Sequence, residues 1–251
     1  MHASDIAEAA ALLASARREG RPLNALPQAA QPSNFAEAAA IQDATVRLLS
    51  ETVPAYKVSG TTPDAAMWAP ILGSRYMRNP GRFAASMVPL LGIEAEIAYR
   101  LKDDITAADR AMTMAEFDRR TMIVPTIEVV DTRFASYDDT PILQRAADFM
   151  SNGGLVYGEP WADGGKQDLT MLAIKLHAGG ALIADTVGGH AAKDPRLPGF
   201  AFIQAPGRPE LLPQGTLITT GSYTGLLYAK PGDIVTAQFA GYGELTVTFP
   251  A

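Results

Sequence analysis

Two glutamates separated by one residue, Glu94 and Glu96, lie in a segment that alternates apolar and other residues from 93 to 101. Successive side chains of a β-strand point to opposite faces, so both carboxylates are expected on one face, with Cα atoms about 6.5 to 7 Å apart. Two carboxylates at that separation can share a cation, and without one they repel each other. The spacing makes this pair a candidate metal site.

A third glutamate, Glu128, lies in a second segment that is typical of a strand, residues 122–130. Three carboxylates on two strands would offer the oxygen ligands that Mg²⁺ or Mn²⁺ prefers. A glutamate pair on a strand can also be a solvated face. Glu128 has apolar neighbours, so its ionised carboxylate needs a partner. That partner is either a metal or one of the cations Lys57, Arg100 and Arg133.

Lys57 precedes a polar turn in the string Tyr56-Lys57-Val58-Ser59-Gly60-Thr61-Thr62, after a short segment that resembles a strand. A lysine at such a position can point into a cleft, although a lysine taken alone is more often an ordinary exposed surface cation. Close to a metal and an apolar wall, the pKa of Lys57 is expected to fall, which would suit acid–base catalysis.

The composition excludes several classes of function. The 251 residues include 47% hydrophobic and 19% charged residues, which is typical of a globular protein with one large or two small domains. The net charge of -6 and the lack of a basic block argue against binding to nucleic acid or to an anionic membrane. The absence of cysteine excludes disulfides, thiolate nucleophiles and zinc–thiolate sites.

Other common chemistries lack their motifs. The string from Gly221 to Gly225 has the wrong spacing for a serine nucleophile elbow. The three histidines, His2, His177 and His190, are scattered, and no glycine-rich phosphate loop is present. Neither a signal peptide nor a membrane-spanning run is recognisable, so the sequence predicts a soluble cytoplasmic protein.

The distribution of patterns predicts an α+β fold, with a helical segment over 1–54 and a β-rich domain over 55–251. Helices are expected from a Ser4 cap to Gly20, from Asn34 to Pro54, from Thr113 to about Arg120, and from Thr140-Pro141 to Asn152-Gly153. Hairpin turns are expected at 178–180 and 241–243. Five prolines in 192–216 predict an irregular loop that could act as a lid.

Four strings together resemble the fumarylacetoacetate hydrolase superfamily, and within it the branch of 2-oxo-4-pentenoate hydratases and 4-oxalocrotonate decarboxylases. They are Lys57 with Thr61-Thr62, Ile93-Glu94-Ala95-Glu96-Ile97-Ala98-Tyr99, Thr126-Ile127-Glu128-Val129-Val130-Asp131-Thr132-Arg133 and Ile218-Thr219-Thr220-Gly221-Ser222. The strings around Glu94 and Glu128 are the most specific, and the resemblance extends through nearly the whole chain.

The resemblance implies N-terminal helices packed on a β-rich roll of mixed strands. Glu94, Glu96 and Glu128 would bind Mg²⁺ or Mn²⁺, and Lys57 would act in the pocket as an acid/base or orienting cation. Asp131 and Arg133 would lie close to the site, and Thr220 with Ser222 would hold the substrate carboxylate, unless these four are simply turn and strand-end residues. The resemblance also implies a homo-oligomer with a role in aromatic catabolism.

The implied activity is hydration of a small 2-hydroxy-2,4-dienoate to a 4-hydroxy-2-oxo acid. The alternatives are decarboxylation of a 2-oxo-dienedioate, cleavage of an acylpyruvate, and binding of a ligand without turnover. The chain departs from the family pattern at Ser59, where glycine is usual, and at Ile71, where an acidic residue is expected. It also has no histidine between His2 and His177, which disfavours the hydrolytic branch.

Overall fold

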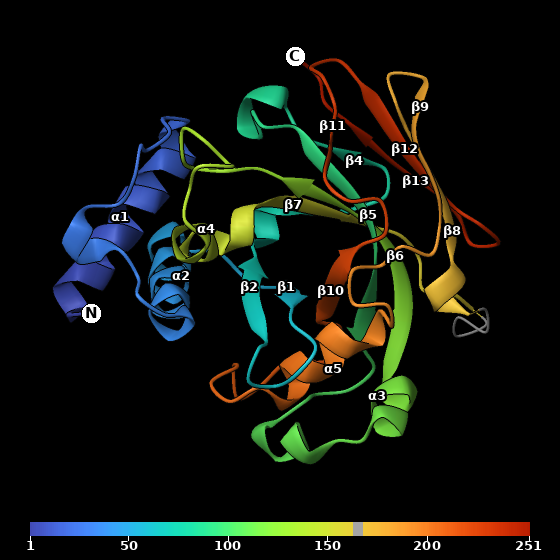
Figure 1. The fold of residues 1–251 in the computed structure, drawn as a ribbon, viewed down its shortest axis with the longest axis horizontal. Helices are drawn as coiled ribbons and strands as arrows, with labels where there is room; N and C mark the ends of the chain where they lie inside the picture. The colour runs from blue at the N-terminus through green and yellow to red at the C-terminus, as the bar shows by residue number, and fades with distance from the viewer. Residues whose placement is uncertain (163–167) are drawn as a thin grey trace.

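The computed structural model describes residues 1–162 and 168–251, and a strongly curled sheet forms its centre (Figure 1). Within these ranges the central sheet has eight strands. They are β1 (Ala55–Ser59), β2 (Met67–Ile71), β3 (Tyr76–Arg78), β5 (Gly92–Leu101), β6 (Thr121–Val130), β7 (Asn152–Tyr157), β10 (Leu217–Ser222) and β11 (Leu227–Tyr228). The order is β2-β1-β10-β5-β6-β7-β3, with β11 paired to β5. Parallel and antiparallel pairs both occur, so the sheet is mixed, as predicted.

A second sheet of five strands, within the same described ranges, lies beside the first (Figure 1). Its strands are β4 (Gly81–Arg82), β8 (Ala173–Ala178), β9 (Ala181–Val187), β12 (Ile234–Phe239) and β13 (Gly243–Thr248), in the order β4-β13-β12-β8-β9. The β8–β9 and β12–β13 hairpins confirm both predicted turns.

The two faces of β5 have different surroundings. Ile93, Ala95 and Ile97 are fully buried in the largest hydrophobic core, together with Val235 and Val247 from the smaller sheet. Because side chains alternate along a strand, Glu94 and Glu96 point to the opposite face. That face is also apolar further along the sheet, where a second cluster forms. Its members are Ala55, Ile71, Ala98, Val124, Leu155 and Leu217.

Three helices pack together on one side of the roll: α1 (Ala3–Glu19), α2 (Phe35–Leu49) and α4 (Ile142–Ala147) (Figure 1). The Asn34 side chain caps α2 by accepting a hydrogen bond of 3.0 Å from the Glu37 N–H, as predicted. The first helix begins two residues earlier than predicted, since His2 rather than Ser4 is its N-cap, and its C-cap is Gly20 with φ of 65°. The second ends at Leu49 instead of Pro54.

The helix predicted over 140–153 is too long. The helix α4 ends at Ala147, a left-handed turn follows over Phe149–Ser151, and Asn152 begins β7. The helix predicted after Thr113 is confirmed as α3 (Met114–Arg120), with the expected capping box.

The prediction of an irregular loop over 192–216 was wrong, because α5 (Arg196–Gln204) lies within it. Pro195 is the N-cap and Pro198 lies in the first turn, where the missing N–H has no intrahelical acceptor to lose. Ala201, Phe202 and Ile203 are buried, so tertiary packing holds this helix against the sheet.

Short 3₁₀ helices connect several of these elements. They are η1 (Gln28–Ala30), η2 (Gly73–Arg75), η3 (Ala85–Met87), η4 (Ala107–Ala111) and η6 (Leu169–Met171), while η5 (Phe149–Ser151) is the left-handed turn described above. Among the described residues, none of the helices has the length and apolar character that crossing a bilayer would require.

Candidate metal centre

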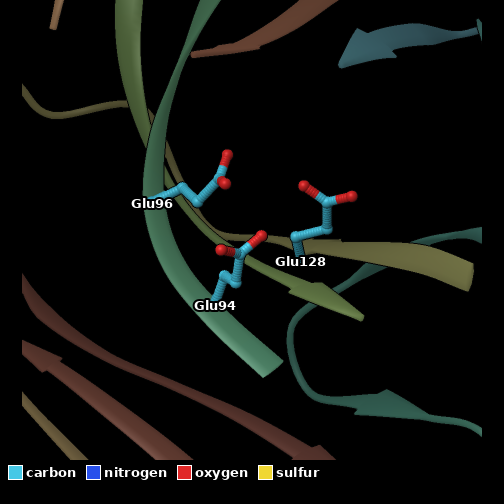
Figure 2. Close-up of side chains that lie close together, drawn as sticks. All are labelled: Glu94, Glu96 and Glu128. Carbon is cyan, nitrogen blue, oxygen red and sulfur yellow. The ribbon is translucent and has the colours of Figure 1, made fainter. Parts of the chain in front are cut away.

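The three glutamates singled out in the sequence converge in the structure (Figure 2). Glu94 and Glu96 come from β5 and Glu128 from the adjacent β6, where Glu94 and Glu128 are direct cross-strand partners. One carboxylate oxygen from each residue lies within 4.8 Å of the other two. Three oxygens at this spacing can coordinate one divalent cation.

Burial makes this cluster unusual. Glu96 is 1% exposed and Glu128 is fully buried, and a buried carboxylate normally has every oxygen paired. Glu96 Oε2 accepts hydrogen bonds from the Thr219 hydroxyl and, at 3.3 Å, from the Gly221 N–H. Glu96 Oε1 and Glu128 Oε2 have no hydrogen-bond partner among the described residues. Two buried carboxylate oxygens without a partner fit a hard cation such as Mg²⁺.

Lys57 is the cation closest to the carboxylates. Its Nζ lies 2.9 Å from Glu128 Oε1 and 3.9 Å from Glu94 Oε2. Burial acts to lower the pKa of Lys57, but the attraction of Glu128, Glu94 and Glu96 outweighs it and raises the pKa above its usual value. The lowering expected from the sequence concerned Lys57 beside a bound metal, and it stays a prediction. Lys57 is an ammonium here.

The carboxylates also disturb one another. Burial raises the pKa of Glu96 well above its usual range, and the negative charges of Glu128 and Glu94 raise it further. Burial raises the pKa of Glu94 as well, although Lys57 opposes this. Three carboxylates thus face a single nearby ammonium, and a divalent cation would compensate the remaining negative charge.

The sheet order explains how Lys57 reaches the glutamates. Lys57 on β1 pairs with Thr219 on β10, and Thr219 pairs with Ala98 on β5. Residues that are cross-strand partners share a face, and Ala98 shares its face with Glu96 because they are two positions apart. The parallel β1–β10 pair therefore sets Lys57 beside carboxylates that lie two strands away.

Replacing Gly60, which ends the strand segment after Lys57, with alanine is expected to reduce the free energy of unfolding more than the same change at Gly232. Gly60 has φ of +84°, and an added Cβ would lie 2.2 Å from the Ala65 carbonyl oxygen. Gly232 has φ of +91°, with no heavy atom of the described residues within 4 Å of such a Cβ. The left-handed backbone alone should cost about 1 to 2 kcal/mol. Urea unfolding measures both losses, and equal losses would contradict a sterically fixed turn at Gly60.

Four further residues of the predicted site have other bonding partners. The Thr220 hydroxyl donates to the Ile97 carbonyl oxygen at 3.4 Å, and the Ser222 hydroxyl lies 3.3 Å from that of Thr224. Asp131 and Arg133 form a buried ion pair of 3.0 Å with each other. Their roles toward a substrate stay predictions.

Asp131 and Arg133 belong to a second buried network of ion pairs and hydrogen bonds. Arg133 Nε lies 2.5 Å from Asp148 Oδ1, and Asp131 Oδ1 accepts a hydrogen bond from the Leu90 N–H at 3.1 Å. This network lies beside a cavity of about 740 Å³ that α1 and the segment after β6 help to line. These pairings give both residues buried structural partners.

Two residues that contact the carboxylates were missed by sequence reasoning. Thr219, one position before the predicted Thr220, is the neighbour on β10 that bonds Glu96. A register shift between Thr219 and Ser222 decides which hydroxyl faces the site, and the sequence gives no sign of it. Asn152 donates from Nδ2 to Glu128 Oε1 at 2.9 Å, although the sequence pattern had assigned it to a helix end.

The chain was compared with protein-family models and with curated proteins. No protein-family model matches the chain. The chain is 27% identical over 161 residues to 4-oxalocrotonate decarboxylase of Pseudomonas putida, and 26% identical over 163 residues to that of Pseudomonas sp. strain CF600. Each match covers 62% of this chain and spans 59% of the relative's length.

Solved structures extend the likeness. A 4-oxalocrotonate decarboxylase from Pseudomonas putida G7, complexed with magnesium and adipate, superposes with a TM-score of 0.83 at 19% identity, covering 99% of this chain and 98% of the other. A fumarylacetoacetate hydrolase from Exiguobacterium antarcticum gives a TM-score of 0.55 at 14% identity, covering 80% and 76% of the two chains.

The fold is thus that of the fumarylacetoacetate hydrolases, with a buried carboxylate cluster at its centre. The chain is therefore similar in sequence to 4-oxalocrotonate decarboxylases and shares its fold with solved structures of the fumarylacetoacetate hydrolase superfamily.

Proposed function

We propose that this chain is a divalent-metal-dependent lyase that acts on a small unsaturated 2-oxo or 2-hydroxy acid. Glu94, Glu96 and Glu128 would hold the metal, with Mg²⁺ the first candidate because a protein of the same fold was crystallised with it. The observation that carries the proposal is the pair of buried, unpartnered oxygens on Glu96 and Glu128. Such oxygens are costly in a fold unless a cation completes their environment.

The residues suit a reaction in which negative charge develops on a 2-oxo acid. A bound divalent cation would supply electrostatic stabilisation of that charge. Lys57 adds a second positive charge at the same place, with its Nζ 2.9 Å from Glu128 Oε1, and its ammonium is the candidate proton donor. The buried apolar cluster that includes Ile71 and Leu155 limits water on this face and strengthens these interactions.

Decarboxylation of a 2-oxo-dienedioate is the reaction that we favour. The carbon–carbon bond to the departing carboxylate breaks, CO₂ leaves, and the electron pair is delocalised toward the 2-oxo group, which then takes up a proton. This reaction needs an electron sink and a proton donor, and protonated Lys57 can be that donor. The relatives named as 4-oxalocrotonate decarboxylases support the choice.

Hydration of a 2-hydroxy-2,4-dienoate is the second candidate. Its support is the resemblance of the strings around Glu94 and Glu128 to the branch that contains both hydratases and decarboxylases. Stabilisation of negative charge at the 2-oxo group would serve both reactions, but hydration also requires a base that activates water.

Product analysis separates these activities. Purified protein with Mg²⁺ would be mixed in parallel with a 2-oxo-hexenedioate and with 2-hydroxypenta-2,4-dienoate, followed by ultraviolet absorbance and mass spectrometry. We expect loss of CO₂ from the dioate, and none after chelation of the metal. Gain of water by the dienoate alone would favour hydration, and cleavage of an acylpyruvate would favour a hydrolase. Oxalate binding without any turnover would identify a ligand-binding homologue and contradict the proposed enzyme.

A further inference from the structure

Asn152 connects the carboxylate cluster to a second buried network. Its side-chain Nδ2 donates to Glu128 Oε1 at 2.9 Å, while its main-chain carbonyl oxygen accepts hydrogen bonds from Arg17 Nη2 at 3.1 Å and Arg133 Nη2 at 3.2 Å. Asn152 is itself 3% exposed. Asn152 therefore touches a candidate metal ligand through its side chain, and through its backbone it touches the buried Arg133 and the partly buried Arg17.

We propose that Asn152 is a positioning residue that selects which oxygen of Glu128 is offered to the metal. This inference rests on the proposed metal-dependent function. Glu128 Oε1 receives two donors, the Asn152 amide and the Lys57 ammonium, each at 2.9 Å. Oε2 is left buried without a partner among the described residues. The two donors hold the carboxylate in one orientation, so that Oε2 is the free ligand atom.

The backbone before Asn152 is unusual and fixes its direction. Phe149, Met150 and Ser151 have positive φ values of 52°, 51° and 59°, a conformation that is costly for residues other than glycine. The turn is held by a hydrogen bond of 2.9 Å from the Asp131 N–H to the Ser151 carbonyl oxygen. A strained turn of this kind persists only where surrounding contacts fix it, which they do here.

The residues after Asn152 are equally constrained. A Cβ on Gly153 would lie 2.7 Å from Asp131 Cβ, and one on Gly154 would lie 2.5 Å from the Phe83 ring. The pairing register between β6 and β7 shifts at this point, between Val129 and Val130. The backbone conformation of this segment is therefore restricted, and the side-chain amide of Asn152 is held in the direction of Glu128.

Arg17 extends this support to the N-terminal helix. It lies on α1, with its Nη2 4.0 Å from Asp148 Oδ1 and its Cζ 5.2 Å from the centroid of the Phe149 ring. Partners of metal ligands are known to orient those ligands, and losing one weakens metal affinity about 10- to 100-fold. Asn152 fits that role because its amide bonds Glu128 while its backbone is anchored on Arg17 and Arg133.

The test uses the full chain and measures Mg²⁺ affinity by isothermal titration calorimetry, without reference to turnover. Asn152→Leu keeps the side-chain shape and the main-chain carbonyl but removes the donor to Glu128. We expect its Mg²⁺ affinity to fall about 10- to 100-fold. Asn152→Ala is the second variant, in case the apolar leucine disturbs folding, and the same loss is expected.

Gln42→Met is the matched control, because Gln42 is also a buried amide. Its Nε2 donates to the Ala146 carbonyl oxygen at 2.6 Å and to the Trp68 carbonyl oxygen at 3.2 Å. These hydrogen bonds fix α2 against its neighbours and do not involve the carboxylates. This variant should lose thermal stability and keep the wild-type Mg²⁺ affinity. A general loss of packing would instead weaken Mg²⁺ binding in all three variants and would overturn the positioning role.

The outcomes separate this inference from the proposed function. If the wild-type chain binds Mg²⁺ and a folded Asn152 variant binds it equally well, Asn152 does not position Glu128. If the wild-type chain binds no divalent cation, the metal centre itself is wrong and the inference fails with it. Weaker binding by the Asn152 variants alone supports the proposal.

Discussion

Replacing Glu96 with glutamine should make the metal-free chain more stable and at the same time abolish its stabilisation by Mg²⁺. Burial and two neighbouring carboxylates disfavour the ionised form of Glu96, as its strongly raised pKa indicates. A neutral amide removes that repulsion, and its oxygen can still accept from the Thr219 hydroxyl. The expected rise in melting temperature is a few degrees, because about 1 kcal/mol moves the melting temperature of a chain of this size by about 2 to 4 °C.

The increase in melting temperature that Mg²⁺ causes should be smaller in Glu96→Gln than in the wild-type chain. A ligand present at about 100 times its dissociation constant stabilises the folded state by about 2.7 kcal/mol, which corresponds here to roughly 5 to 10 °C. The wild-type chain should show this shift, whereas Glu96→Gln should show little or none because one of three ligands is gone. Thermal unfolding with Mg²⁺ and with a chelator measures both effects.

A surface glutamate provides the control for the Glu96 experiment. Glu159 is 69% exposed and pairs with Arg78, and surface pairs contribute little to stability. Glu159→Gln should therefore match the wild-type chain with and without Mg²⁺. A Glu96→Gln variant that is less stable than the wild-type chain without metal would contradict the repulsion between the carboxylates. A variant that keeps the full Mg²⁺ shift would contradict the assignment of Glu96 as a ligand.

Replacing Lys57 with methionine should destabilise the metal-free chain strongly and abolish turnover. The ammonium compensates Glu128 at 2.9 Å and Glu94 at 3.9 Å. Removing one member of a buried ion pair typically costs about 3 to 5 kcal/mol. Mg²⁺ would then restore much of the lost stability, so the metal-induced shift in melting temperature should exceed that of the wild-type chain.

Mg²⁺ should restore the stability of Lys57→Met without restoring its turnover. If Lys57 donates the proton, its loss should lower the catalytic rate by about 10²- to 10⁴-fold even with saturating Mg²⁺. Lys175→Met is the control, since the Lys175–Asp185 pair lies on the surface at 3.7 Å and should affect neither measurement. Full turnover by a Lys57→Met variant would exclude Lys57 as the proton donor and leave the metal ligands unaffected.

Local periodicity predicted much of the framework. The alternation over residues 93–101 places Glu94 and Glu96 on one face of β5, and the structure has the strand over Gly92–Leu101. Cap residues located α2 and α3, and glycine turns located two hairpins. These features depend on neighbours within a few residues, so the sequence specifies them directly.

Local rules failed where distant contacts decide the backbone. The prolines around α5 suggested a loop, yet burial of Phe202 and Ile203 holds a helix there. The helix predicted to reach Asn152 stops at Ala147, because the left-handed turn and its bond to Asp131 redirect the chain. Propensity is a weak guide in both places, since tertiary packing outweighs it.

The sequence by itself determined which carboxylates share a strand face and which lysine lies near a strand end. Only the tertiary structure decided that Glu94 faces Glu128 across β5 and β6, that Thr219 rather than Thr220 bonds Glu96, and that Asn152 holds Glu128. The physical reason is the range of the interactions. Side-chain alternation is a property of each strand alone, whereas strand register and the pairing of buried charges depend on segments brought together only when the whole sheet closes.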